Sequence, residues 1–212
     1  IRNFCKEKKI DLILKQTDAP LPKARQIGIE LVETDWFLFL DSDVELTEGY
    51  FNQLTNHIEK EVGAVQGRKQ QTFDENAEEY CPDDKEWVER RSFRGGTHAT
   101  LIRKSAVEGI NIPEDLRTWE DEYLRRYIEG KKFVNGNWVE RKENYEWIFA
   151  PDAIFYPDQS SSFEKTEYEG RIFAKYGFKP AYRVIGRAIK SMDEEDIRAA
   201  KEYVKTKLGV RN

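Results

Sequence analysis

An apolar pentapeptide that runs directly into two acidic residues constrains this chain more than any other feature. Residues 36–40 read Trp-Phe-Leu-Phe-Leu, and Asp41, Ser42 and Asp43 follow at once. A short apolar run of this kind predicts a buried strand. Open α/β sheets bind their ligands at the ends of such strands. Two neighbouring carboxylates repel each other and need a positive partner, so a hard divalent cation with a phosphate-bearing ligand would suit this position.

The spacing of the two acidic residues leaves two interpretations open. In an extended backbone, residues i and i+2 point to the same side, so Asp41 and Asp43 can reach one cation or one cation-bound phosphate. The alternative is an acidic turn that caps the next helix. The calcium loop of an EF-hand is excluded, because Leu46 stands where that loop needs glycine and Asn52 stands where it needs glutamate.

Short apolar strands alternate with helical patterns along most of the chain. This alternation predicts an α/β fold in which a mostly parallel sheet is flanked by helices, with further helices at the C-terminus. We expect one domain over residues 1–178 and a C-terminal helical extension over residues 179–212. The expected strands are 10–14, 36–40, 62–65, 97–103, 147–150 and 153–156, and the main expected helices are 22–33, 47–58, 84–91 and 119–130.

The composition narrows the class of protein. The 212 residues carry a formal charge of −5, which argues against general nucleic-acid binding because that needs a basic surface. The longest apolar run is too short to span a bilayer, so we expect no transmembrane segment. Cys5 and Cys81 form no metal-type pair and are typical of reduced intracellular thiols. We therefore expect a cytoplasmic protein, either free or peripheral to a membrane.

Two further segments carry charged residues that suit catalysis or binding. Arg25 lies on the helix expected before the acidic strand, where its guanidinium could contact a diphosphate or pair with Asp41. Glu120 and Asp121 open another expected helix directly after Trp119. They could simply favour the positive end of that helix, or one of them could act as a general base that accepts a hydroxyl proton.

A pair of glycines stands before the strand expected at 97–103. Gly95 and Gly96 would let the backbone approach a ligand closely, or they could mark a plain strand entry. His98 follows two residues later. A lone histidine is more often structural or exposed than catalytic, so we do not count His98 among the expected site residues.

The order of these segments resembles the inverting family 2 glycosyltransferases of the GT-A fold. Each motif is weak alone, but their order is fairly specific, and the resemblance covers residues 10–178. It rests on Lys-Ala-Arg-Gln-Ile-Gly at 23–28, Phe-Leu-Phe-Leu-Asp-Ser-Asp at 37–43, Arg-Gly-Gly-Thr-His-Ala-Thr-Leu-Ile-Arg-Lys at 94–104, Asp-Leu at 115–116 and Trp-Glu-Asp-Glu-Tyr-Leu at 119–124.

The resemblance implies a role for each candidate residue. Asp43 would bind Mn²⁺ or Mg²⁺, which holds the diphosphate of a nucleotide sugar, and Asp41 would lie near the ribose or the metal. Asp121 would be the general base that deprotonates the acceptor hydroxyl, with Glu120 beside it. Arg25 would belong to the donor site, and Gly95 and Gly96 would line the donor sugar.

Two departures from the family pattern stand out. The opening strand of the family and its acidic base-contacting residue should precede residue 10, and the chain begins with Ile1, so we expect N-terminal residues to be missing. Many members also carry a metal-binding histidine after the late strand, where this chain has Asp158. Asp158 could replace it, because a carboxylate is a good ligand for a hard cation, or it could be a turn residue beside Pro157.

The resemblance also sets the expected partners. They are a nucleotide-diphosphate sugar donor and a glycan, lipid-linked or small-molecule acceptor. The alternatives are a sugar-phosphate nucleotidyltransferase, which binds a cation through similar acidic residues, and a non-catalytic binding domain of the same fold. The sugar, the nucleotide base and the acceptor do not follow from the sequence.

Overall fold

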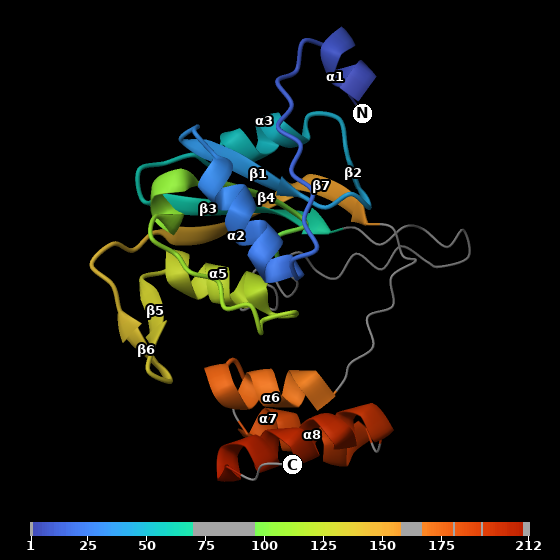
Figure 1. The fold of residues 1–212 in the computed structure, drawn as a ribbon, viewed down its shortest axis with the longest axis vertical. Helices are drawn as coiled ribbons and strands as arrows, with labels where there is room; N and C mark the ends of the chain where they lie inside the picture. Colours follow the sequence, from blue (N-terminus) through green and yellow to red (C-terminus); the bar gives the residue numbers. More distant parts are fainter. Residues whose placement is uncertain (1, 70–95, 158–166, 180, 192, 210–212) are drawn as a thin grey trace.

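The computed structural model describes residues 2–69, 96–157, 167–179, 181–191 and 193–209. These residues form a central sheet with helices on both faces and a group of C-terminal helices (Figure 1). The expected helix at 84–91, Cys81, Gly95 and Asp158 lie outside the described residues. None of the described helices is long and apolar enough to span a membrane.

Five strands form the central sheet in the order β1-β4-β3-β7-β2. They are β1 (Trp36–Leu40), β2 (Val44–Leu46), β3 (Val62–Lys69), β4 (Ala99–Arg103) and β7 (Glu146–Pro157). β1, β3 and β7 run in one direction, and β4 and β2 run in the other, so β3–β7 is the one parallel pair in the described sheet. The expectation of a mostly parallel sheet is therefore wrong, because apolar patterns indicate strands but not the direction of their long-range partners.

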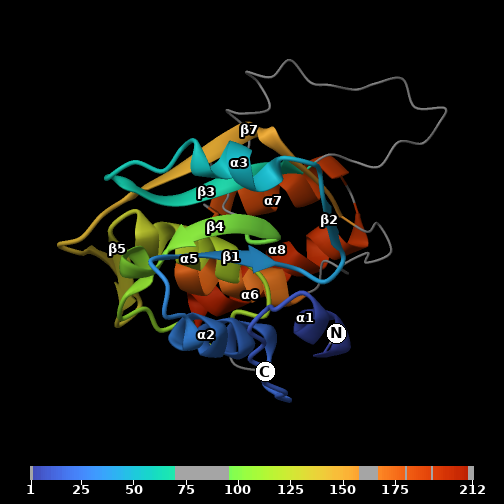
Figure 2. The same cartoon turned by 90° about the horizontal axis from the view of Figure 1, so that it is seen from above.

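The alternation of side chains along the strands gives the sheet two packed faces. On one face, Tyr50 and Leu54 of α3 (Tyr50–Thr55) pack with Val65 of β3 and Leu101 of β4. On the other face, Ile102 of β4 packs with residues of α2 (Leu21–Leu31), the 3-10 helix η1 (Lys104–Val107) and α5 (Glu120–Ile128). Figure 2 shows α3 and α2 on opposite sides of the sheet.

Three strand expectations need correction. The segments 147–150 and 153–156, expected as two strands, belong to the single strand β7. β1 is one of the two edge strands of the described sheet, so its side chains are only half buried, and Leu40 is 49% exposed rather than buried. Residues 10–14, expected as a strand, form no regular element and pair with no described strand. Their apolar side chains are exposed, so an apolar run alone did not determine the strand.

A hairpin that we did not predict follows α5. β5 (Lys131–Val134) pairs with β6 (Asn137–Glu140), and Asn135 and Gly136 form the turn with φ angles of 50° and 85°. Two successive positive φ angles are typical of the tight turns that join two strands, and an Asn-Gly pair is the strongest sequence signal for them. This signal was therefore present in the sequence at 135–136.

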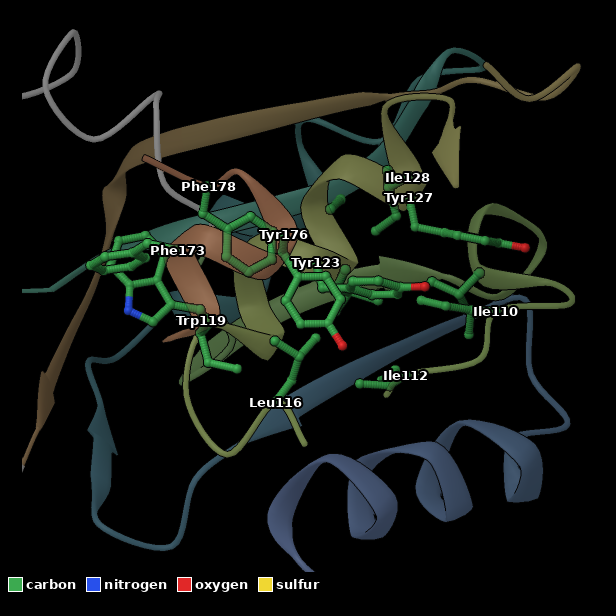
Figure 3. Close-up of a cluster of buried hydrophobic side chains, with 14 of the residues drawn as sticks. Ile110, Ile112, Leu116, Trp119, Tyr123, Tyr127, Ile128, Phe173, Tyr176 and Phe178 are labelled. Carbon is green, nitrogen blue, oxygen red and sulfur yellow. The ribbon is translucent and has the colours of Figure 1, made fainter. Parts of the chain in front are cut away.

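The C-terminal helices share a hydrophobic cluster with α5. They are α6 (Glu167–Tyr176), α7 (Ala181–Ser191) and α8 (Glu194–Leu208), and α5 lies between them and the sheet (Figure 1). Aromatic residues of these helices and of their flanking residues meet in one buried cluster with those at α5: Trp119, Tyr123, Phe173, Tyr176, Phe178 and Tyr203 belong to it. Figure 3 draws part of this cluster. The domain boundary expected after residue 178 falls between α6 and α7 and stays a prediction. The short helix α1 (Arg2–Glu7) opens the described chain.

Candidate active site

The antiparallel pairing of β1 with β4 brings the first candidate residues together. Leu40 pairs with Ala99, and the backbone N–H of Asp41 donates to the carbonyl of His98 at 2.9 Å. The end of β1 therefore lies beside the start of β4. β3 and β7 also have their C-terminal ends on this side of the sheet, because both run in the same direction as β1.

The two acidic residues after β1 stand on a turn rather than on an extended segment. The N–H of Val44 donates back to the carbonyl of Asp41 at 3.3 Å, which closes the turn around Ser42 and Asp43. The expectation that both carboxylates share one side of an extended strand is therefore wrong. Asp41 is half buried, whereas Asp43 is exposed and has no hydrogen bond or ion pair with the described residues.

Among the described residues, the side chain of Asp41 has two polar partners. Its Oδ2 lies 2.7 Å from Nδ1 of His98, and its Oδ1 lies 3.5 Å from a guanidinium nitrogen of Arg25. The two contacts use different carboxylate oxygens, so they fix the side chain from two directions. This leaves Asp43 as the freer of the two carboxylates toward solvent.

Arg25 connects the turn after β1 with the start of α5. Its guanidinium lies 2.7 Å from Oε1 of Glu120, and it also donates to the hydroxyl of Thr97. The side chains of Arg25 and Glu120 are each 9% exposed. Buried charges need partners of this kind, because removal from water disfavours an isolated ion. One buried cation thus joins α2, the end of β1, the entry to β4 and the start of α5.

The backbone at Trp119 determines where α5 begins. Trp119 is the residue before the helix and adopts a left-handed conformation with φ 67°. For a residue other than glycine this conformation is disfavoured by about 1–2 kcal/mol, so the surrounding contacts must hold it. Glu120, Asp121 and Glu122 follow in the first turn, and all three are buried. The positive end of the helix favours carboxylates there.

The three acidic residues of α5 have different surroundings. Glu120 binds Arg25, and Glu122 accepts from Arg125 at 2.9 Å and from Arg126 at 2.9 Å. Oδ1 of Asp121 accepts from the backbone N–H of Glu122 at 2.8 Å. Glu122 therefore stabilises the helix itself, whereas Glu120 contributes to the contacts with the turn after β1.

Gly96 packs against β3 rather than against open space. A Cβ added there would lie 3.1 Å from Nε2 of Gln66, so glycine allows this close approach. Gln66 is itself held by Trp147 of β7, whose indole nitrogen donates to its Oε1 at 2.9 Å. Strand packing thus explains a glycine at this position, and a contact between Gly96 and a donor sugar stays a prediction.

The structure thus brings together Arg25, Asp41 and Glu120 in direct contact. Asp43 lies on the same turn as Asp41, and Asp121 lies next to Glu120. Sequence reasoning missed Thr97, whose hydroxyl completes the surroundings of Arg25, and it set His98 aside. Thr97 lies within the motif at 94–104, but the resemblance gives this position no role, and only its place beside the glycine pair suggested closeness to the site.

The donor chemistry of the turn fits a hard divalent cation that is shared with a ligand. Among the described residues there is no group of three or more His, Cys, Asp or Glu side chains that could hold a metal. Mg²⁺, however, is usually held by one or two carboxylates together with waters and substrate phosphates. The exposed carboxylate of Asp43, unpaired among the described residues, and the neighbouring Asp41 fit this second mode rather than a closed protein cage.

The comparison with known families agrees with this geometry. Residues 1–109 match the model described as Glycosyl transferase family 2, which is half of the chain. The chain therefore belongs to glycosyl transferase family 2. The matched region includes Arg25, Asp41, Asp43 and Gly96, whereas Glu120 and Asp121 lie beyond it. No curated protein matches the chain.

Proposed function

We propose that this chain is a metal-dependent inverting glycosyltransferase that moves a sugar from a nucleotide-diphosphate sugar to an acceptor hydroxyl. The main support is the position of Arg25, which lies 2.7 Å from Glu120 and 3.5 Å from Asp41. One side chain thus brings the acidic turn after β1 close to the acidic start of α5. The turn after β1 offers carboxylates that can hold a cation for an anionic donor. The acidic start of α5 offers a carboxylate that can accept the proton of an acceptor hydroxyl.

In this proposal the two acidic regions have separate roles. Asp43 holds Mn²⁺ or Mg²⁺, and Asp41, fixed by Arg25 and His98, completes the donor side of the site. When bound, the cation supplies positive charge that stabilises the diphosphate leaving group. Asp158 is a further proposed ligand outside the described residues. Gly96 is proposed to line the donor sugar, together with Gly95, which lies outside the described residues.

Asp121 is the proposed general base. It takes the proton of the acceptor hydroxyl while the acceptor oxygen forms its bond to the anomeric carbon. The bond between that carbon and the diphosphate oxygen breaks on the opposite face, and its electron pair leaves with the nucleoside diphosphate. This displacement inverts the anomeric centre without a covalent enzyme intermediate. Glu120, the residue before Asp121, keeps Arg25 in place through their ion pair.

Titration of the full-length protein with UDP and GDP, with and without Mn²⁺, tests the donor side. We expect binding that needs the metal and that is lost in Asp43→Ala. Glu45→Ala is the matched control, because Glu45 is an exposed carboxylate two residues further along. Binding of a nucleoside triphosphate with release of pyrophosphate would instead identify a nucleotidyltransferase. No binding under any condition would favour a non-catalytic domain.

Asp121→Asn tests the base. We expect transfer to fall by at least about 100-fold, because a positioned acid or base contributes on the order of 10²–10⁴-fold to rate. Affinity for the nucleoside diphosphate should stay within about twofold, since Asp121 is not assigned to the donor. Asp152→Asn, at an exposed position in β7, is the control. Transfer by Asp121→Asn at the wild-type rate would remove Asp121 as base.

A further inference from the structure

The segment that leads into α5 is held by α6 at three places. At its start, Asp115 Oδ2 lies 2.5 Å from the amine of Lys175, and Asp115 Oδ1 accepts from the hydroxyl of Tyr176 at 2.7 Å. In its middle, the backbone N–H of Arg117 donates to the hydroxyl of Tyr168 at 2.8 Å. These partners all come from one helix.

The third place is Trp119, directly before the acidic pair. Its indole nitrogen donates to Oε1 of Glu169 at 3.0 Å. Its ring meets the ring of Phe173 edge-on, with centroids 4.7 Å apart, and stacks on Phe178 at 6.1 Å (Figure 3). Trp119 is only 7% exposed, so α6 and the residues after it enclose most of the side chain.

These contacts explain how the unusual backbone at Trp119 is maintained. Trp119, with a φ of 67°, is the last residue outside the helical conformation, and α5 begins at the next residue, Glu120. A hydrogen bond and two ring contacts fix the indole, so they also fix the direction in which the helix starts. Glu120 then reaches Arg25 at 2.7 Å. Contacts therefore run without a gap from α6 to the turn after β1.

We propose that α6 positions the acidic start of α5 by holding Trp119 and the segment 115–119, with Glu169 and Tyr176 as positioning residues. The inference rests on the proposed function, in which Asp121 is the base. Glu169 and Tyr176 act through Trp119 and Asp115 and touch no substrate. The rate of transfer therefore depends on them, whereas donor binding at the turn after β1 does not.

The test compares Glu169→Ala and Tyr176→Phe in the full-length protein. We expect kcat for transfer to fall by about 10- to 100-fold, because small misplacements of a reacting group have effects of this size. The KM for the donor and the metal-dependent affinity for nucleoside diphosphate should stay within about twofold of wild type. Glu169→Gln should restore most of the rate, since its amide oxygen can accept from the indole.

Two controls separate positioning from a general loss of stability. Arg171→Ala changes an exposed residue of the same helix, whose guanidinium lies 3.9 Å from Glu202, and should leave kcat unchanged. Tyr176→Phe removes one hydroxyl and keeps the ring in the aromatic cluster, so it remains informative if Glu169→Ala does not fold. Hydrogen exchange over residues 115–124 should rise in both variants and stay at the wild-type level in Arg171→Ala.

The outcomes distinguish this inference from the proposed function. If Tyr176→Phe and Glu169→Ala keep the wild-type kcat, or if Glu169→Gln loses as much as Glu169→Ala, the positioning role is wrong. If the wild-type protein transfers no sugar from any nucleotide donor, the proposed function fails. Hydrogen exchange then still decides the structural part: unchanged exchange at 115–124 overturns it, and faster exchange confined to that segment supports it.

Discussion

Two acidic segments of similar appearance in the sequence have opposite surroundings in the fold. The segment Asp41-Ser42-Asp43 lies on a turn, and Asp43 is exposed and without a polar partner among the described residues. The segment Glu120-Asp121-Glu122 lies at the start of a helix, and all three side chains are buried. An open carboxylate can take up a cation from solvent, whereas an enclosed one is fixed in direction. The difference suits the first segment to ligand binding and the second to a positioned proton transfer.

The largest effect is expected where the two segments meet, at Arg25. Arg25→Ala removes the buried guanidinium that pairs with Glu120 at 2.7 Å, so the free energy of unfolding should fall by about 3 kcal/mol. The ordinary control is Lys23→Ala on the same helix, because the Lys23–Glu114 pair is exposed and 3.7 Å long. That control should change stability by less than about 0.5 kcal/mol. Urea unfolding of both variants gives the answer; equal effects would mean that Arg25 does not link the two segments.

A smaller effect on stability is expected at Asp115, in the segment that leads into α5, and this effect depends on pH. Partial burial acts to raise the pKa of Asp115, but hydrogen bonds from Lys175 and Tyr176 outweigh it and hold the pKa below its ordinary value. A carboxyl group with a lowered pKa stabilises the fold above that ordinary value, and the contribution is lost as the pH falls through the lowered one. Burial and the charge of Asp115 in turn raise the pKa of Tyr176, which keeps its hydroxyl a donor.

Asp115→Asn should therefore lower stability by at most about 1 kcal/mol near neutral pH, since the ion pair with Lys175 is half exposed. The difference from wild type should shrink as the pH falls below about 4. Denaturant unfolding at a series of pH values measures this. A difference that is constant with pH would show that the charge of Asp115 does not contribute.

Thr118 offers a test in which substitution should raise stability or leave it unchanged. Its hydroxyl is buried and has no hydrogen-bond partner among the described residues, although Thr118 stands just before the buried acidic segment of α5. Thr118→Val replaces the hydroxyl by a methyl group of similar shape, so stability should be unchanged or rise by about 1 kcal/mol. The matched control is Thr100→Val, because the buried hydroxyl of Thr100 donates to the carbonyl of Gly96. There we expect a loss of about 1 kcal/mol; the same sign in both variants would contradict the assignment.

The smallest effect on stability is expected at Asp43. Because it is exposed and unpaired among the described residues, Asp43→Ala should change the free energy of unfolding by less than about 0.5 kcal/mol. The same variant should lose metal-dependent nucleoside diphosphate binding. Thermal unfolding without ligand separates the two effects. A loss of more than about 1 kcal/mol would mean that the turn is as enclosed as the start of α5.

The sequence predicted the kinds of element better than their arrangement. The helix beginning near Pro22 and the helix that starts at Glu120 are present, because apolar spacing and a proline in the first turn, as at Pro22, are local signals. The direction of β4 between β1 and β3 could not be predicted, since it depends on partners far apart in the chain. Residues 10–14 show the converse error: a local apolar pattern was present, but no described strand pairs with it.

The candidate site was predictable in its residue types and not in its contacts. Asp41, Arg25 and Glu120 were recognised separately, and a pairing of Arg25 with Asp41 was one of the open alternatives. The contact between Arg25 and Glu120 joins residues 95 positions apart, so no spacing rule could indicate it. The same applies to Glu169 and Trp119, because a hydrogen bond between a loop and a later helix leaves no periodic trace.

The left-handed residue Trp119 before α5 also limits where residues can be inserted into this chain. Successive helical residues are rotated by about 100°, so one residue inserted between Trp119 and Asp121 would turn the carboxylates to another side of the helix. Insertions that preserve the arrangement of Glu120 and Asp121 should therefore be absent from the first turn of α5.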